Sequence, residues 1–193
     1  GIYAYNSSHN TFDSLMIDGN IPIQGTSLIE LEENCNHNVI TNCKLNGGYI
    51  GLRLKNCSDN NIVRNCSSTN HQHSGLTIYE SDNNAIKNNY IEASANCGMY
   101  IIFGSSRNNI EGNTIINNLE YGVIMDRRGT KDELPRENIL RKNTISGNAN
   151  EGIMMDAMAK RNKLIENTIF DNQKMLSREV QPPLEVEKRR KRK

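Results

Sequence analysis

The sequence contains no tryptophan and only four prolines, and aromatic residues occupy just 5% of its 193 positions. Apolar residues make up 36% of the chain, which is too little for a thick core but enough for a thin core extended along an axis. No apolar run approaches the ~20 residues that a membrane-spanning helix needs. The composition therefore argues against a membrane protein and favours an elongated, repetitive domain.

Most of the chain also has no excess of basic over acidic residues. The formal net charge is +1, but six of the 23 basic residues form the run "KRRKRK" at positions 188–193. The other 17 face 22 acidic residues, so the body is mildly acidic, which argues against a nucleic-acid-binding domain. We interpret residues 177–193 as a flexible basic tail. A solvated appendage explains it better than a nuclear-import or polyanion-binding segment does.

Asparagine, by contrast, is abundant and regularly spaced. The segment "NNAIKNNYI" ends at Ile91, and similar segments begin at Asn108, Asn138 and Asn162. One asparagine lies two places before an aliphatic or aromatic residue in each repeat, at intervals of 23 to 30 residues: Asn10, Asn38, Asn61, Asn84, Asn108, Asn138 and Asn162. Self-similarity at such a period indicates a repeat architecture.

Each repeat contains two or three short stretches that alternate apolar and polar residues. Seven places after each repeat asparagine stand Ile17, Leu45, Ser68, Ile91, Ile115, Ile145 and Ile169. A second stretch, usually led by glycine as in "GLRL" at Gly51, precedes each repeat asparagine by about ten places. This spacing predicts short strands that pair in parallel with the same strand one repeat later.

We therefore predict an all-β fold, a right-handed parallel β-helix of about seven coils with 23–24 residues per coil, over residues 1–176. The chain begins at Gly1 within a repeat, so we expect a piece of a longer protein. Asparagine tolerates the left-handed conformation of sharp corners, and its amide can bond to the residue stacked above it. We interpret the asparagine columns as scaffold. The five cysteines fall largely in the same columns and are expected to be small buried residues, neither disulfides nor metal ligands.

The pattern "N-x-I-x-x-N-x-I" followed by "G-I-x-L-x-x-S-x-N-N" resembles the right-handed parallel β-helix repeat of pectin-lyase-like proteins. That group includes carbohydrate-binding and sugar-hydrolase repeats, NosD-like periplasmic proteins and alginate epimerases. The resemblance covers Gly1 to about Asn172 and implies a polysaccharide partner, with the glycine-led strand forming the face on which sugars lie. It also implies a secreted, periplasmic or cell-surface location. The Asp-Pro-His tripeptide typical of alginate epimerases is missing, so no catalytic residue is carried over.

The residues two and four places after each leading glycine should point outward. They are Tyr3 and Tyr5, Glu30 and Glu32, Arg53 and Lys55, Thr77 and Tyr79, Tyr100 and Ile102, Ile124 and Asp126, and Met154 and Asp156. Exposed tyrosines suit the apolar faces of sugars, and Arg53 and Lys55 suit uronate carboxylates. Alternatively, Glu30 with Arg53 and Glu32 with Lys55 form ion pairs between neighbouring coils.

Asp126 and Asp156 occupy the same column on consecutive coils, which would place them ~5 Å apart. Such a pair could serve as general acid and base of a lyase, epimerase or glycoside hydrolase, or as Ca²⁺ ligands. Pairing with Arg127 and Arg128 is a structural alternative. These arginines begin a charged insertion, residues 127–137, which could bind substrate or form an ordinary surface loop.

Histidines and methionines offer a weaker signal. His71 and His73 flank Gln72 beside the predicted sugar-binding face. The two histidines could bind a metal or supply a base for proton abstraction, and His73 could contact substrate, although a solvated turn is favoured. Met99, Met125, Met154, Met155 and Met158 could suggest copper, but core filling explains them better. Three functions thus stay open: a polysaccharide-binding or polysaccharide-modifying protein, a structural or interaction solenoid, and a NosD-like accessory protein in metal-centre maturation.

Overall fold

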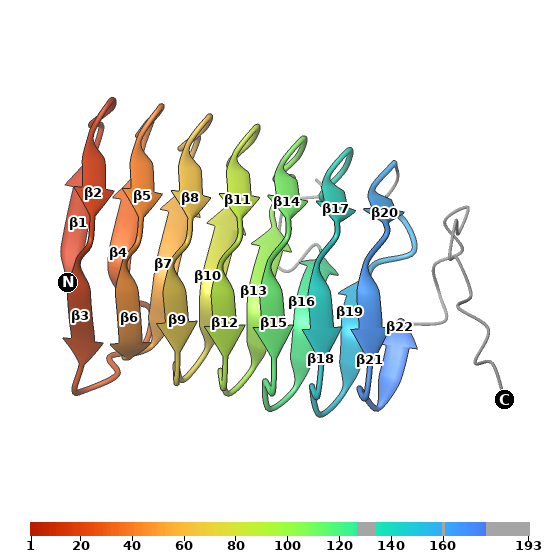
Figure 1. Cartoon of the computed structure of the whole chain (residues 1–193). Helices are drawn as coiled ribbons and strands as arrows, with labels where there is room; N and C mark the ends of the chain where they lie inside the picture. Colours follow the sequence, from red (N-terminus) through yellow and green to blue (C-terminus); the bar gives the residue numbers. More distant parts are fainter. Residues whose placement is uncertain (127–133, 160, 177–193) are drawn as a thin grey trace, which may run out of the picture.

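A computed structural model describes residues 1–126, 134–159 and 161–176. In this part of the chain all regular structure is β, and 22 short strands wind into a right-handed solenoid of about seven coils (Figure 1). The three sheets are parallel throughout. The predicted fold is therefore confirmed. The basic tail at 177–193, Arg127 and Arg128 lie outside the described residues.

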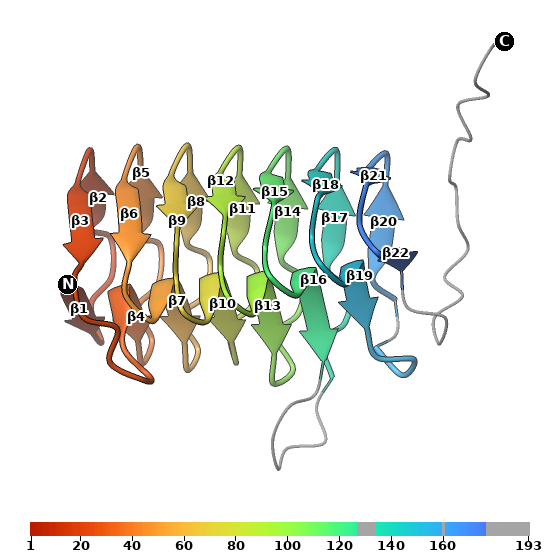
Figure 2. The same cartoon turned by 90° about the horizontal axis from the view of Figure 1, so that it is seen from below.

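Each coil contributes one strand to each of three sheets. The eight-stranded sheet contains β1 (Ile2–Tyr5), β4 (Ser27–Glu32), β7 (Ile50–Lys55), β10 (Ser74–Tyr79), β13 (Cys97–Ile102), β16 (Tyr121–Asp126), β19 (Glu151–Met155) and β22 (Lys174–Leu176). The second sheet contains β2 (Thr11–Asp13), β5 (Val39–Thr41), β8 (Ile62–Arg64), β11 (Ala85–Lys87), β14 (Asn109–Glu111), β17 (Ile139–Arg141) and β20 (Lys163–Ile165). The third sheet contains β3 (Met16–Gly19), β6 (Lys44–Gly47), β9 (Ser67–Thr69), β12 (Tyr90–Glu92), β15 (Thr114–Ile116), β18 (Thr144–Ser146) and β21 (Thr168–Phe170). β1 and β22 lie at opposite ends of the eight-stranded sheet (Figure 2).

The strands pair in the register that the repeats predict. Ile86 lies between Val63 and Ile110 in the second sheet, and Ile91 lies between Ser68 and Ile115 in the third. These inward columns form one continuous core of fully buried aliphatic side chains. A one-residue slip would turn every aliphatic residue of a strand toward solvent, so the core itself fixes the register.

Asparagine ladders connect the coils inside the corners. In the first ladder, the backbone N–H of each repeat asparagine donates to the Oδ1 atom of the next at 2.8–2.9 Å, from Asn10 to Asn162. A second ladder continues from Cys66 through Asn89 to Asn167 at 2.9–3.0 Å. A third ladder, which we did not predict, continues from Ser94 to Asn172. The scaffold interpretation of the asparagines is confirmed.

The corners adopt the left-handed conformation as expected, but the asparagines that adopt it are not the repeat asparagines of the ladders. Of the 24 described non-glycine residues with positive φ, ten are asparagine, for example Asn60 and Asn83. Each of these two directly precedes a ladder residue, Asn61 or Asn84, that bonds to the next coil. One asparagine thus adopts the positive φ of the corner, and the asparagine after it forms the ladder bond.

Cysteines and methionines mostly fill the core. Cys35, Cys43, Cys66 and Cys97 are buried, and burial raises the pKa of the Cys66 thiol to about 12. Cys57 is exposed, so the prediction of burial is wrong for that residue. The core also buries Met99, Met125 and Met155, whereas Met154 is half-buried and Met158 is exposed.

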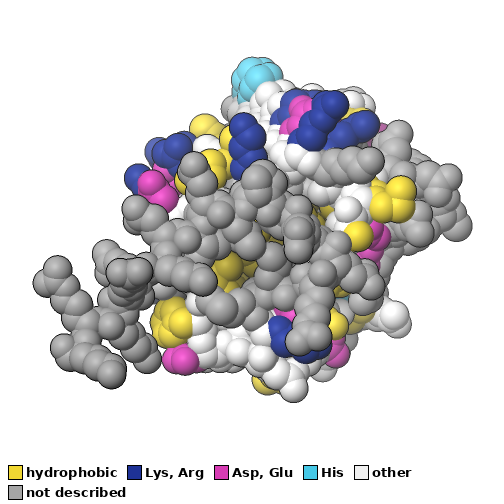
Figure 3. Space-filling view, turned by 90° about the vertical axis from the view of Figure 1, so that its right-hand side faces the viewer, with side chains coloured by type: hydrophobic (Ala, Val, Ile, Leu, Met, Phe, Trp, Pro, Cys, Tyr) yellow, Lys and Arg dark blue, Asp and Glu magenta, His cyan; other side chains and the backbone are white. Residues whose placement is uncertain are grey.

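Ion pairs join neighbouring coils on the outer surface. Arg141 lies 2.5 Å from Glu111, and Arg161 lies 3.0 Å from Glu137. Seen from the end at which β22 lies, described basic and acidic side chains lie beside one another (Figure 3). Such exposed pairs stabilise the fold little, by ~0–1 kcal/mol each, and mainly balance the charge along the stack.

The glycines that lead the strands of the eight-stranded sheet face the core. A Cβ atom on Gly98 would lie 2.4 Å from Cγ2 of Ile115 and 2.8 Å from Nδ2 of Asn118. On β4 the same slot holds Leu28, because its neighbour there is Gly48, which leaves space for the larger side chain. Glycine is therefore required where a bulky ladder residue lies opposite.

Gly98→Ala should lower the free energy of unfolding by about 2 kcal/mol, because overpacking of a close-packed core costs ~1–3 kcal/mol. Urea denaturation would measure this loss. Thr144→Ala, on the outer face of β18, should change stability by no more than about 0.5 kcal/mol. Equal stability of Gly98→Ala and wild type would show that the core at this coil is not closely packed.

Candidate functional site

Tyrosine is concentrated on the outer face of the eight-stranded sheet. Six of the seven tyrosines lie on its strands or, in the case of Tyr49, directly before one; Tyr90 alone lies on the third sheet. Alternation begins at the residue after the leading glycine, so that Leu52 and Leu54 are buried in the core and Arg53, Tyr79 and their equivalents turn outward, as the sequence predicts. We call this surface, formed by the outward side chains of β1 to β19, the sheet face.

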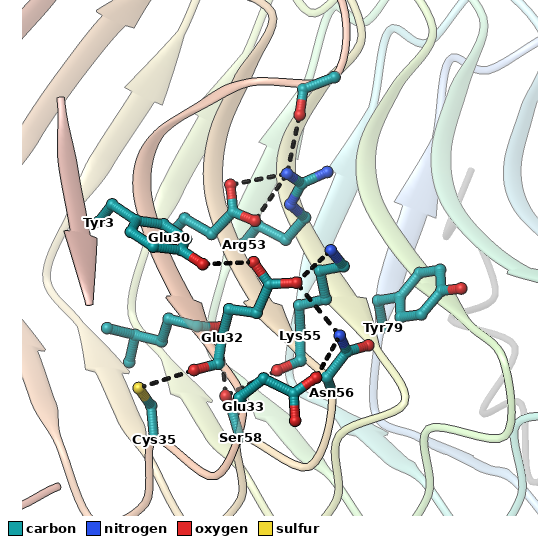
Figure 4. Close-up of polar contacts among 12 residues, drawn as sticks. Tyr3, Glu30, Glu32, Glu33, Cys35, Arg53, Lys55, Asn56, Ser58 and Tyr79 are labelled. Carbon is teal, nitrogen blue, oxygen red and sulfur yellow. Dashed lines mark hydrogen bonds and ion pairs between the residues drawn. The ribbon is translucent and has the colours of Figure 1, made fainter. Parts of the chain in front are cut away.

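Arg53 on the sheet face is held by Glu30 of the preceding coil. Its Nη2 atom donates to Oε1 and Oε2 of Glu30 at 2.7 and 2.6 Å and to the carbonyl oxygen of Gly25 at 2.8 Å (Figure 4). Both side chains are largely buried, with 16% and 9% of their surface exposed. The alternative interpretation as an ion pair between coils is therefore confirmed for these residues.

Lys55 forms the second such pair. Its Nζ atom donates to Oε1 of Glu32, and the hydroxyl of Tyr3 donates to Oε2 of the same carboxylate at 2.9 Å (Figure 4). The hydrogen bond from Lys55 lowers the pKa of Glu32, against a smaller opposing effect of burial. The carboxylate in turn raises the pKa of Tyr3 to about 12. Tyr3, Glu32 and Lys55 thus form one connected network across three coils.

Aromatic side chains cover the middle of the sheet face. The rings of Tyr79 and Phe103 have centroids 4.2 Å apart. The ring of His73 lies between Tyr49, at 5.2 Å, and Tyr100, at 5.7 Å. Tyr49, His73, Tyr79 and Phe103 are half-buried. Tyr49 and His73 directly precede β7 and β10, whereas Tyr79 ends β10 and Phe103 follows β13, and we call these two pairs together the aromatic patch.

Tyr100 is not exposed, contrary to expectation. Only 5% of its surface is accessible, and Ile102 and Ile124 are as deeply buried. With Cys97 they form a second apolar cluster, against which Tyr79, Phe103, Tyr121 and Met154 pack. Tyr100 therefore supports the aromatic patch from beneath, and direct contact of its ring with a ligand is no longer favoured.

His71 points into the core, whereas His73 lies on the sheet face with Tyr49 and Tyr100. His71 is 1% exposed, with Nδ1 2.5 Å from the carbonyl oxygen of Gly47 and Nε2 2.9 Å from Oγ of Ser68. Burial lowers its pKa to about 4. The solvated-turn interpretation is therefore wrong for His71, and the two histidines do not converge on one ligand.

Asp126 ends β16 and Asp156 directly follows β19, and these two strands pair in register. Met125 pairs with Met155, and the backbone N–H of Asp156 donates to the carbonyl oxygen of Met125 at 2.9 Å. Oδ1 of Asp156 accepts a bond from the backbone N–H of Met158 at 2.8 Å. The carboxylate of Asp156 thus stabilises its own turn, while a catalytic role of the two aspartates stays a prediction.

Metal binding finds no support in the described coils. They contain no group of three or more His, Cys, Asp or Glu side chains that could hold a metal ion. Ca²⁺ binding by Asp126 and Asp156 therefore stays a prediction. Within the same residues no helix is long and apolar enough to cross a membrane.

Several residues of the site were not predicted. Tyr49 lies two places before Gly51, as His73 does before Gly75, so the turn column itself was a usable signal. Phe103 follows β13 in a left-handed conformation with φ of 51°, which the strand pattern does not predict. Tyr121 replaces the Cys97 of the coil before it.

The family model described as "Right handed beta helix region" matches residues 1–169. A comparison with curated proteins finds no match. A mutant of the periplasmic alginate epimerase AlgG has a TM-score of 0.73 at 18% identity over 87% of this chain and 43% of its own. The A-module of the Azotobacter vinelandii mannuronan C-5 epimerase AlgE4 has a TM-score of 0.72 at 17% identity over 94% of this chain and 55% of its own. A GH87 α-1,3-glucanase catalytic domain has a TM-score of 0.50 at 11% identity, over 89% of this chain and 36% of its own. The chain thus spans about half or less of each structure, and these likenesses concern the fold alone.

Proposed function

The chain belongs to the right handed beta helix family, and on this premise we propose that it binds a polysaccharide along the sheet face. The observation that carries the proposal is the aromatic patch. Half-buried rings of Tyr49, His73, Tyr79 and Phe103 lie on neighbouring coils of a rigid sheet. Aromatic rings with polar tips suit ligands that have apolar faces and hydroxyl edges, as sugar rings do.

The solenoid suits a polymer better than a small ligand. Successive strands of a sheet lie ~4.8 Å apart, so the patch offers contacts at regular intervals along the axis. The space among the core residues Leu45, Ser68 and Ile91 is too small to hold a sugar ring. A site for a long ligand must therefore be a surface, and the sheet face is the surface richest in aromatic side chains.

The structural neighbours support a polysaccharide ligand. Their names describe an alginate epimerase, a mannuronan epimerase and an α-1,3-glucanase, all of which act on polysaccharides. We extend to this chain the ligand class but no reaction, and with it a location outside the cytoplasm, as for the periplasmic epimerase. Asp126 and Asp156 are the residues to test first if the bound glycan is also cleaved or epimerised.

Tyr79→Ala should weaken glycan binding about tenfold, because an aromatic contact contributes ~0.5–1.5 kcal/mol beyond the buried area. Isothermal titration against a panel of soluble polysaccharides would measure the affinity. Tyr90→Ala removes a tyrosine from the third sheet, 38% exposed, and is the matched control that should bind like wild type. Equal losses in both variants, or no binding by the wild-type protein, would contradict the proposal.

A further inference from the structure

Resting on this proposed function, we infer that the glycan on the sheet face is uncharged, in contrast to the uronate polymers that the sequence suggested. Recognition of a uronate carboxylate needs a basic side chain that is available to form a charge-assisted hydrogen bond. Three basic residues stand on the described strands of the eight-stranded sheet: Arg53, Lys55 and Lys174. Each is paired with an acidic residue of the coil before it.

Arg53 is the least available of the three. Its Nη2 atom already bonds to both oxygens of Glu30 and to the carbonyl oxygen of Gly25, and its Nε atom is buried without a partner. A uronate that captured this guanidinium would leave the carboxylate of Glu30, which is 7% exposed, buried and unpaired. Such a loss of a partner costs more than a new surface ion pair returns.

Lys55 is committed in the same way. Glu32 receives hydrogen bonds from Lys55, from the Tyr3 hydroxyl at 2.9 Å and from Nδ2 of Asn56 at 3.2 Å. If the side chain of Lys55 turned from Glu32 to a ligand, the network that spans three coils would be broken. The third base, Lys174, lies 3.7 Å from Glu151, at the far edge of the sheet from Tyr3.

Acidic residues also outnumber basic residues on these strands. The described strands of the eight-stranded sheet carry Glu30, Glu32, Asp126 and Glu151 against the three bases. A polyanion that approaches these strands meets no excess of positive charge to attract it. The aromatic patch, by contrast, offers contacts that do not depend on charge.

The test compares neutral and charged oligosaccharides of equal length at low ionic strength, where electrostatic attraction is strongest. The probes are linear glucohexaoses with α-1,3, β-1,3 and β-1,4 linkages, and hexamannuronate and hexagalacturonate. We expect at least one glucohexaose to bind at least tenfold more tightly than either uronate, with an affinity that does not change on addition of salt. Glu32→Gln, which releases Lys55, should improve uronate binding at least threefold and leave the glucohexaose affinity within twofold; a thermal melt checks its folding.

The outcomes separate the two proposals. Wild-type binding of a uronate hexamer as tight as that of the best glucohexaose would overturn the inference of an uncharged glycan and leave the proposed function standing. A lack of binding to every probe would overturn the proposed function, and the inference with it. Uronate affinity that is unchanged in Glu32→Gln would contradict the claim that the ion pair withholds Lys55.

Discussion

Replacement of Asn113 by alanine is expected to lower the free energy of unfolding by about 4 kcal/mol, because it removes four buried hydrogen bonds that contribute ~1 kcal/mol each. The Oδ1 atom of Asn113 accepts bonds from the backbone and side chain of Asn89 at 2.9 and 3.0 Å. Its Nδ2 atom donates to Ile86 and Asn143 at 2.9 and 3.0 Å. Alanine would remove all four of these bonds and leave the buried backbone N–H of Asn89 without its acceptor, whereas Nδ2 of Asn89 keeps its bond to Val63 and Oδ1 of Asn143 keeps its bond from the backbone N–H of residue 113. Urea denaturation monitored by circular dichroism measures the loss.

Asn109→Ala is the matched control for this variant. Asn109 stands on the outer face of β14, where Ala85 occupies the paired position one coil earlier. Its Oδ1 atom has no hydrogen-bond partner among the described residues. Its replacement should therefore change stability by no more than about 0.5 kcal/mol. Equal effects of the two substitutions would show that the ladders do not hold the coils together.

Acidification should destabilise the fold through His71. Its pKa is about 4 in the folded protein, against 6.5 for an unperturbed histidine, so the folded state favours the neutral ring. The stability is fully present above pH 6.5 and is lost as the pH falls toward 4, because the unfolded chain binds the proton first. Between pH 7 and pH 5 the loss should reach about 2 kcal/mol.

His71→Asn isolates this contribution. Asn118, Asn148 and Asn172 stand at the equivalent ladder position in later coils, so asparagine is compatible with the corner. The variant should show a pH dependence smaller by about 2 kcal/mol over the same range, whatever its stability at pH 7. Carboxylates such as Glu111, whose pKa is lowered by Arg141, contribute equally to both proteins and cancel. Identical pH dependence in both proteins would mean that His71 is not the titrating group.

The fold could be predicted from the sequence because one physical requirement repeats in every coil. Ile86, Ile91 and their equivalents must face a thin core, and a parallel stack is the arrangement that satisfies all of them at one period. The ladder asparagines reinforce the same register. Local and long-range preferences therefore agree throughout the described coils.

The site was harder to predict because alternation gives the direction of a side chain but not its surroundings. Tyr100 points outward as expected, yet Ile102 and Ile124 bury it in a second apolar cluster. Reading the outward columns along the axis reveals this cluster as a run of apolar residues on adjacent coils. His71 was misread for the opposite reason, since a polar residue in a turn can occupy an inward ladder position.

The most direct test of the account is to locate the ligand on the protein. Isotope-labelled protein would be titrated with the glucohexaose that binds most tightly, and the perturbed amide resonances assigned. We expect the perturbations to fall on β7, β10 and β13 around Tyr79 and Phe103, with the second and third sheets unchanged. Perturbations confined to the second or third sheet would contradict the assignment of the sheet face as the glycan-binding surface.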